Sequence, residues 1–219
     1  MKKAILFGAS GFIGSCLLLD LLNNTDYDQV TIVVRKTLGL NHPKLIELID
    51  DYDTVDGLKG KIEADEIFIT LGTTRKNTPD RAHYYQIDHD YPVKAAKIAR
   101  ENGAKSVFVV TAVGADANST IFYSKTKGEI ERDILSLNFE HTCIFRPSLI
   151  MGKRKENRTV ESILIKIWAY VNPILIGKSL KKYRGLTGQD IARAMMNAAK
   201  EEKAVVRILG WQEMTDLQG

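Results

Sequence analysis

Cysteine and histidine are scarce in this sequence, which has 219 residues but only two cysteines and four histidines. Cys16 and Cys143 are far apart and form no Cys-x-x-Cys motif, so neither a disulfide framework nor a zinc site is indicated. Two isolated thiols are typical of buried side chains in a reducing compartment. We therefore expect no metal and no structural disulfide.

Long apolar runs are also missing. No stretch approaches the roughly 18 consecutive apolar residues of a transmembrane helix, so no membrane contact is expected. Met1-Lys2-Lys3 and the apolar residues up to Cys16 have the general shape of a secretion signal. Three evenly spaced glycines interrupt this stretch, however, and they fit a phosphate loop better. We therefore expect a cytoplasmic protein.

A large excess of charge of one sign is absent as well, because 31 Lys and Arg stand against 27 Asp and Glu. The basic residues are spread along the chain, so nucleic-acid binding gains little support. Hydrophobic residues make up 44% and charged residues 26%, the balance of an ordinary globular protein. The length fits one domain over residues 1–219, as a monomer or a homodimer that acts on a small molecule.

Short apolar runs alternate with helical patterns over the first two thirds of the chain. The expected strands cover 4–7, 30–34, 45–49, 67–71, 107–110 and 142–145, and the expected helices cover 12–22, 82–101 and 122–135. This alternation is typical of βαβ units with right-handed crossovers. We therefore predict an α/β fold with a doubly wound, mostly parallel, Rossmann-like sheet.

The last third of the chain has a different pattern. A basic loop over 153–158 precedes an expected helix over 160–171, and a surface helix over 190–200 precedes a late strand over 205–209. We interpret about 151–187 as a small C-terminal cap on the substrate side, within the same domain.

Three glycines lie between the first expected strand and the first expected helix, in Gly8-Ala9-Ser10-Gly11-Phe12-Ile13-Gly14. Gly8 permits a tight turn, Gly11 lets the backbone approach a pyrophosphate, and Gly14 lets the helix pack close to the sheet. The helix N-terminus adds N–H groups and the positive end of its dipole. Together with Ser10, Phe12 and Ile13 these glycines predict a dinucleotide site. The alternative is a structural turn without a ligand.

The end of the second expected strand indicates which dinucleotide binds. Arg35 and Lys36 follow Val34, and no Asp or Glu near this strand end serves the adenine ribose diol that NAD presents. A guanidinium suits the 2′-phosphate of NADP because it binds phosphate in a bidentate manner. The sequence therefore favours NADP(H) over NAD(H), and an exposed basic pair is the alternative interpretation.

Tyr123 and Lys127 are four residues apart in an expected helix and so lie on one face of it. With eight Tyr in the chain such a pair occurs easily by chance, and its position carries the information. It follows the strand over 107–110, which ends at Thr111, and such strand ends converge on the cofactor crevice. We predict Thr111, Tyr123 and Lys127 as catalytic residues, because a cationic Lys127 and a cationic nicotinamide would both lower the pKa of the Tyr123 phenol.

These motifs, with Arg146-Pro147, resemble the short-chain dehydrogenase/reductase superfamily in its atypical or extended branch. The segments Leu71-Gly72-Thr73-Thr74-Arg75 and Ile87-Asp88-His89-Asp90-Tyr91 are similar to the TIP30-like oxidoreductase subgroup, as is Tyr123 through Lys127-Gly128-Glu129. The resemblance spans nearly the whole chain and implies a Rossmann fold that binds NADPH.

The resemblance also implies roles for single residues. Leu71, Gly72 and Thr73 would bind the cofactor, the last two against its ribose, and Pro147 and Ser148 would flank the nicotinamide. The family's Ser/Thr–Tyr–Lys set corresponds here to Thr111, Tyr123 and Lys127. The chain departs from the subgroup where paired serines would stand, since it has Thr111-Ala112. Its cap is also short compared with that of sugar-nucleotide epimerases.

Two functions follow from these observations. The first is an NADPH-dependent oxidoreductase that acts on a small carbonyl or alcohol through Thr111, Tyr123 and Lys127. The second is an NADP(H)-binding sensor or scaffold without catalysis, which Ala112 favours because it lacks the hydroxyl of a serine.

Overall fold

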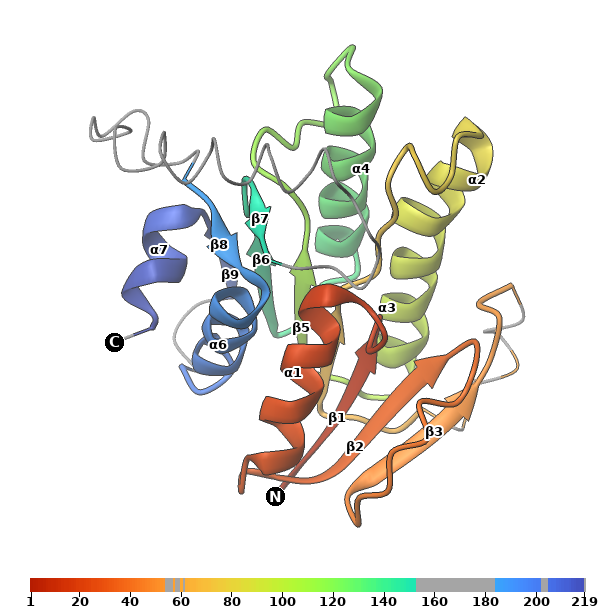
Figure 1. Cartoon of the computed structure of the whole chain (residues 1–219), viewed down its shortest axis with the longest axis vertical. Coiled ribbons are helices and arrows are strands. Elements are labelled where there is room, and N and C mark those ends of the chain that lie inside the picture. Colours follow the sequence, from red (N-terminus) through yellow and green to blue (C-terminus); the bar gives the residue numbers. More distant parts are fainter. Residues whose placement is uncertain (54–56, 58–59, 61, 153–183, 202–204, 219) are drawn as a thin grey trace.

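The computed structural model describes residues 1–53, 57, 60, 62–152, 184–201 and 205–218 (Figure 1). Its main sheet has seven strands in the order β3-β2-β1-β4-β5-β6-β9. The strands are β1 (Lys2–Phe7), β2 (Tyr27–Val34), β3 (Leu45–Ile49), β4 (Glu66–Ile69), β5 (Ser106–Val110), β6 (His141–Phe145) and β9 (Val206–Leu209). All neighbouring strands in it are parallel. The predicted doubly wound, Rossmann-like fold is confirmed, and the strand order reverses between β1 and β4.

Helices cover both faces of this sheet (Figure 1). On one face lie α1 (Phe12–Asn23), α6 (Gly188–Ala198) and α7 (Trp211–Asp216). On the other lie α3 (Tyr91–Glu101) and α4 (Phe122–Ser136). Alternate residues of each strand enter two separate cores: Leu6 packs with α1 and α6, whereas Ile5 packs with α3 and α4. Burial on both faces explains why the strands are nearly continuous apolar runs in the sequence.

The helix expected over 82–101 is continuous but not uniform. It consists of α2 (Arg81–Tyr85), a π-helical segment η2 (Gln86–Asp90) and α3. Pro92 at the start of α3 lacks the N–H that would bond to the carbonyl of Asp88, so the regular α-helical ladder cannot run through this point. Hydrophobic periodicity alone does not reveal such a segment, yet single π turns often occur at functional sites.

Two further elements were not expected. A short second sheet pairs β7 (Ile150–Met151) with β8 (Leu186–Thr187), and α7 follows the last strand. The basic loop over 153–158 and the helix over 160–171 lie outside the described residues, as does most of the cap expected over 151–187. The cap and the single-domain assignment therefore stay predictions. In the described part of the chain no helix has the length and hydropathy to cross a membrane.

Candidate functional site

The glycine loop lies at the carboxyl end of β1, against the residue that follows β4. Gly8 has φ +93°, and a Cβ there would lie 2.8 Å from the Thr70 carbonyl carbon. The Thr70 hydroxyl donates to the carbonyl oxygen of Phe7 at 3.1 Å, which holds the two strand ends together. Only glycine fits both the backbone conformation and the contact at this position. The loop is therefore fixed at the point where the strand order reverses.

Gly11 and Gly14 place the N-terminus of α1 beside this turn. Gly11 is the N-cap of α1, its N–H bonds to the Gly8 carbonyl at 2.9 Å, and no side chain caps the helix. A Cβ on Gly14 would overlap the Gly8 carbonyl oxygen, so the helix can approach the turn only with glycine there. The first-turn N–H groups are left without side-chain partners, which is the arrangement that binds phosphate. The cradle therefore fits the diphosphate of a dinucleotide.

The other loop residues differ in what they offer. Ser10 is exposed and Ile13 is buried in the core under α1. The Phe12 ring packs against the start of α6, where a Cβ on Gly188 would lie 2.9 Å from its Cε1 atom. Phe12 and Ile13 can therefore contact a ligand through their backbone, while their side chains hold the loop to the rest of the fold.

Arg35 and Lys36 are exposed beyond the end of β2, as the sequence suggested. The expectation that no acidic residue lies near this strand end is wrong. Asp50 follows β3, which runs parallel to β2, and its N–H bonds to the Val34 carbonyl at 3.0 Å. Parallel neighbours end at the same edge of a sheet, so Asp50 is close to Arg35 in space although it is distant in the chain. Only the strand order, which places β3 beside β2, could reveal this neighbour.

Tyr123 and Lys127 open α4 at the same edge of the sheet. Tyr123 is 45% exposed, whereas Lys127 is buried. The Lys127 ammonium forms an ion pair with Asp88 of η2, at 2.5 Å. A Cβ on Gly72 would lie 3.8 Å from Lys127 Nζ, and the Thr73 N–H donates to Asp88 at 2.7 Å. The predicted residues Gly72, Thr73 and Lys127 are thus brought together, while Leu71 is half-buried beside them.

Asp88 is the member of this group that the sequence interpretation missed. The segment over 87–91 contributed to the family resemblance, but no role was assigned to the carboxyl group. A signal was present, because Asp88, His89 and Asp90 are polar residues within a helical pattern that otherwise presents an apolar face to the core. The π-helical segment turns Asp88 inward, where it is 1% exposed.

The environment of the Tyr123 phenol differs from the expectation. Its pKa is raised above the ordinary value because the surrounding protein displaces part of the water around the side chain, and this effect and the Asp88 charge together outweigh the lowering by Lys127. The sequence predicted a lowered pKa from the charges of Lys127 and of a bound nicotinamide, and it showed neither the burial of this side chain nor the charge of Asp88. In the protein without a bound nucleotide, Tyr123 is therefore protonated at neutral pH.

Thr111 lies at the end of β5 and is buried. Its hydroxyl donates to the Glu131 carboxylate at 2.6 Å, and Glu131 in turn pairs with Arg146, whose Nε lies 3.0 Å away. The Thr111 hydroxyl hydrogen is therefore donated to a buried carboxylate and not to the site. The catalytic role of Thr111 stays a prediction, and this hydrogen bond argues against it. Ala112 follows it and is also buried.

Pro147 and Ser148 lie next to this strand end. The Pro147 carbonyl accepts the Val113 N–H at 2.9 Å, which joins the loops after β5 and β6. The Ser148 hydroxyl donates to the Arg184 carbonyl at 2.5 Å. Both residues are at the predicted edge of the sheet, and their contact with a nicotinamide stays a prediction.

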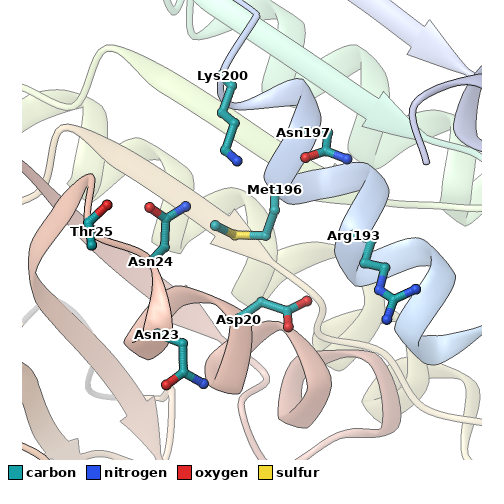
Figure 2. A pocket seen from close by; sticks show the side chains of 8 residues that line it. All are labelled: Asp20, Asn23, Asn24, Thr25, Arg193, Met196, Asn197 and Lys200. Carbon is teal, nitrogen blue, oxygen red and sulfur yellow. The ribbon is translucent and has the colours of Figure 1, made fainter. Parts of the chain in front are cut away.

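A hollow of about 370 Å³ lies elsewhere, between the C-terminal ends of α1 and α6 (Figure 2). Its polar lining includes Asp20, Asn24, Arg193 and Lys200. It is separated from the glycine loop by the length of α1, so it does not belong to the candidate site. Among the residues that the structure describes, no cluster of His, Cys, Asp or Glu could hold a metal ion.

The strand order and the glycine loop define an NAD(P)-binding Rossmann protein of the short-chain dehydrogenase/reductase type. More specifically, the chain belongs to the NAD dependent epimerase/dehydratase family, which it matches over residues 4–208.

Curated relatives are similar along almost the whole chain. "Protein FMP52, mitochondrial" of Eremothecium gossypii is 30% identical and covers 98% of this chain and 96% of its own length. "Protein fmp52, mitochondrial" of Aspergillus fumigatus is 34% identical and covers 90% of this chain and 87% of its own length. The expectation of a cytoplasmic protein is contradicted by these relatives, which are named as mitochondrial. Composition and fold do not encode a cellular address, which a receptor reads separately.

Solved structures share the fold at low sequence identity. The UDP-N-acetylglucosamine 4-epimerase from Methanobrevibacter ruminantium has a TM-score of 0.71 and 17% identity, over 95% of this chain and 76% of that chain. The UDP-glucuronic acid 4-epimerase from Bacillus cereus in complex with NAD has a TM-score of 0.68 and 15% identity, over 95% and 77%. These neighbours show that the fold is shared, and the NAD in the Bacillus cereus structure is a ligand of that protein.

Proposed function

We propose that this protein is an NADP(H)-dependent oxidoreductase that acts on a small carbonyl or alcohol through Tyr123 and Lys127. The observation that carries the proposal is the meeting of the glycine cradle and the Tyr123–Lys127 pair at one edge of the sheet. This edge, at the carboxyl ends of the strands, is where doubly wound folds bind ligands.

The chain's own residues supply binding and a proton. The first turn of α1 and the glycine backbone would hold the diphosphate, with Gly72 and Thr73 beside the ribose. A bound nicotinamide supplies hydride chemistry at a substrate carbon. Tyr123 would then donate its phenol proton to the substrate oxygen in reduction, or accept one in oxidation. Its hydroxyl can be replenished from water because the side chain is 45% exposed.

Thr111 takes a different part in this proposal from that expected of a catalytic hydroxyl. Because its hydrogen is donated to Glu131, Thr111 supports the carboxyl end of β5 rather than the substrate. Tyr123 is then the group that contacts the substrate oxygen, and Lys127 orients it.

The preference for NADP(H) rests on Arg35, whose guanidinium is exposed where the adenine ribose would lie. A small substrate is favoured because the expected cap over 151–187 is short for a nucleotide sugar. We also propose, from the motif resemblance, that the protein is a member of the TIP30-like subgroup.

The test is turnover by the Tyr123→Phe variant against a panel of small carbonyls with NADPH. We expect NADPH oxidation to fall by about 100-fold or more, the scale of general acid catalysis, with NADPH affinity nearly unchanged. Tyr85→Phe is the matched control, since Tyr85 stacks on His89 with ring centroids 4.5 Å apart and lies outside the site. Equal turnover by Tyr123→Phe and the wild type would refute the proposal.

A second candidate is an NADP(H)-binding sensor or scaffold without turnover. The hydroxyl of Thr111, which is donated to Glu131, and the lack of a hydroxyl on Ala112 favour it, because neither residue at the end of β5 offers a hydroxyl hydrogen to a substrate. Steady consumption of NADPH with any carbonyl of the panel would exclude this candidate. Tight NADPH binding with no turnover would favour it.

A further inference from the structure

The carboxylate of Asp88 joins three parts of the candidate site. Its Oδ1 atom lies 2.5 Å from Lys127 Nζ of α4, and its Oδ2 atom accepts the Thr73 N–H of the β4–α2 loop at 2.7 Å. Burial and the nearby Asp88 charge raise the pKa of the Tyr84 phenol in α2, which lies close to this carboxylate. An ammonium and a backbone amide therefore contact one carboxylate that is 1% exposed.

The ion pair between Asp88 and Lys127 also changes the electrostatics of the site. Charges interact strongly where water is excluded, and the side chains of Lys127 and Asp88 are only 6% and 1% exposed. The positive charge that a Tyr-x-x-x-Lys pair normally presents to its phenol is therefore partly balanced by Asp88. Lys127 is held in place, yet its charge acts on Tyr123 less than the sequence alone would suggest.

We propose that Asp88 is a positioning residue that holds Lys127 and adds its own negative charge beside the Tyr123 phenol, so that Tyr123 stays a proton donor at neutral pH and the site is set for carbonyl reduction rather than alcohol oxidation. The proposal rests on the proposed function of the Tyr123–Lys127 pair. In the reduction, hydride from NADPH forms a C–H bond at the carbonyl carbon, and the oxygen takes the Tyr123 proton. NADPH becomes NADP⁺, and water returns a proton to the phenolate.

The charged and titratable groups around the phenol agree with this assignment. Within the described residues the charges that act on it are those of Lys127 on α4 and Asp88 on η2, and the titratable phenol of Tyr84 on α2 is close to it. Burial has the largest effect and raises the pKa of Tyr123, Lys127 lowers it, and the Asp88 charge raises it again by a smaller amount. A phenol with a raised pKa donates a proton at neutral pH but is seldom available to accept one.

The direct test places 3-fluorotyrosine at position 123 and follows its ¹⁹F resonance during a pH titration of the protein without nucleotide. In Asp88→Asn the titration midpoint should fall by about one pH unit or more, the usual effect of removing a charge at this distance. Asp88→Glu keeps the charge and should restore the midpoint toward that of the wild type. Asp133→Asn, which removes the same charge from the outer face of α4, should leave it unmoved.

Asp88→Asn leaves Lys127 buried without its counter-ion, which could prevent this variant from folding. A second pair of variants tests the proposal in that case. In Lys127→Gln the phenol is next to the negative charge of Asp88 without the positive charge of Lys127. The titration midpoint at position 123 should therefore be higher than in the wild type. Lys127→Gln with Asp88→Asn contains no unpaired charge, and its midpoint should fall below that of the single variant. Equal midpoints in these two proteins would overturn the proposal.

The kinetic counterpart is the pH profile of turnover. The alkaline limb of carbonyl reduction should move to lower pH in Asp88→Asn by the same amount as the ¹⁹F midpoint, and alcohol oxidation at neutral pH should rise relative to reduction. A parallel loss of both directions with an unchanged ¹⁹F midpoint would show a purely structural role for Asp88. Absence of turnover in the wild type would remove the proposed function, while the ¹⁹F titration would still decide whether Asp88 controls the phenol.

Discussion

The Thr111 hydroxyl donates a hydrogen bond to the Glu131 carboxylate, 2.6 Å away, and so points into the fold beneath the candidate site. Both residues are buried, and Arg146 completes the group through its contact with the same carboxylate. Thr111 therefore joins β5, α4 and the end of β6, and its catalytic role stays a prediction.

This contact makes a prediction about Thr111→Val. The free energy of unfolding should fall by about 1–3 kcal/mol because a buried carboxylate loses a donor, while turnover at saturating NADPH should change little. Chemical denaturation and steady-state kinetics measure the two effects, and Thr111→Ser should restore stability. A loss of turnover of about 100-fold, as expected on removal of a transition-state donor, would instead make Thr111 catalytic.

The glycine loop offers a prediction that separates folding from binding. Gly14→Ala should lower the free energy of unfolding by about 1–3 kcal/mol through overpacking, because the new methyl group overlaps the Gly8 carbonyl oxygen. At Gly11 a Cβ would lie 3.1 Å from that oxygen, and the position is exposed with φ −78°, so Gly11→Ala should fold.

Gly11→Ala should nevertheless bind the dinucleotide about tenfold more weakly, or about 1.4 kcal/mol, because its methyl group lies where the diphosphate would approach. Thermal unfolding and calorimetric titration with NADPH measure the two properties. Unchanged NADPH affinity in a folded Gly11→Ala protein would place the dinucleotide elsewhere.

Cofactor choice is tested at Arg35. Arg35→Asp should weaken NADPH binding by about 1.5–3 kcal/mol, the scale of a charged hydrogen bond, and should affect NADH less. Calorimetry with both nucleotides gives the comparison, and Arg193→Asp on the distant α6 is a control for the change in net charge. An equal effect on the two nucleotides would assign Arg35 to ordinary surface, and selection would then rest with neighbours such as Asp50.

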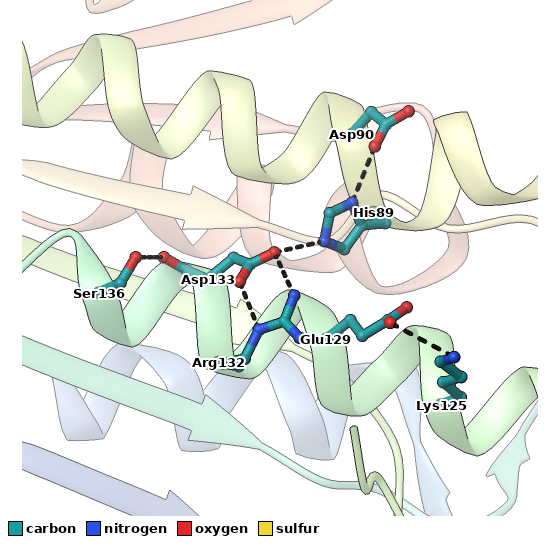
Figure 3. Close-up of polar contacts among 7 residues, drawn as sticks. All are labelled: His89, Asp90, Lys125, Glu129, Arg132, Asp133 and Ser136. Carbon is teal, nitrogen blue, oxygen red and sulfur yellow. Dashed lines mark hydrogen bonds and ion pairs between the residues drawn. The ribbon is translucent and has the colours of Figure 1, made fainter. Parts of the chain in front are cut away.

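A group of ionic contacts on the outer face of η2 and α4 predicts a pH effect on stability (Figure 3). Asp133 contacts Arg132 at 2.7 Å and His89 at 2.9 Å. The hydrogen bond from Arg132, followed by contributions from His89, lowers the pKa of Asp133 below its ordinary value. A lowered folded-state pKa stabilises the fold above the unfolded-state pKa, and this contribution is lost as pH falls through the folded-state value.

Asp133→Asn should accordingly lower the free energy of unfolding at pH 7 by no more than about 1 kcal/mol, since the contact is partly exposed. The difference from the wild type should shrink as the pH falls through the lowered pKa of Asp133. Urea denaturation at a series of pH values measures this, with Glu140→Gln on an exposed position as the control. A difference that stayed constant down to the acid transition would contradict the assignment.

The elements themselves were largely predictable from the sequence. The runs at 30–34, 107–110 and 142–145 are strands within a few residues of the expected ends, because burial on both faces requires continuous apolar side chains. The glycine loop was recognisable because each glycine is required by the local backbone, at Gly8 for the positive φ and at Gly14 for the close approach of the helix. The π-helical segment was not predictable, because it arises within a helical pattern that looks regular until the ladder is interrupted at Pro92.

By itself the sequence determined the α/β class, the position of the dinucleotide cradle and the pairing of Tyr123 with Lys127 on one helix face, since each depends on residues close together in the chain. Only the tertiary structure decided that Asp88 balances Lys127, that Thr111 is bound to Glu131, and that Asp50 lies beside Val34. The reason is physical. Strand order and burial bring together charges that are distant in the chain, and their contacts decide which hydroxyl is free and which phenol keeps its proton.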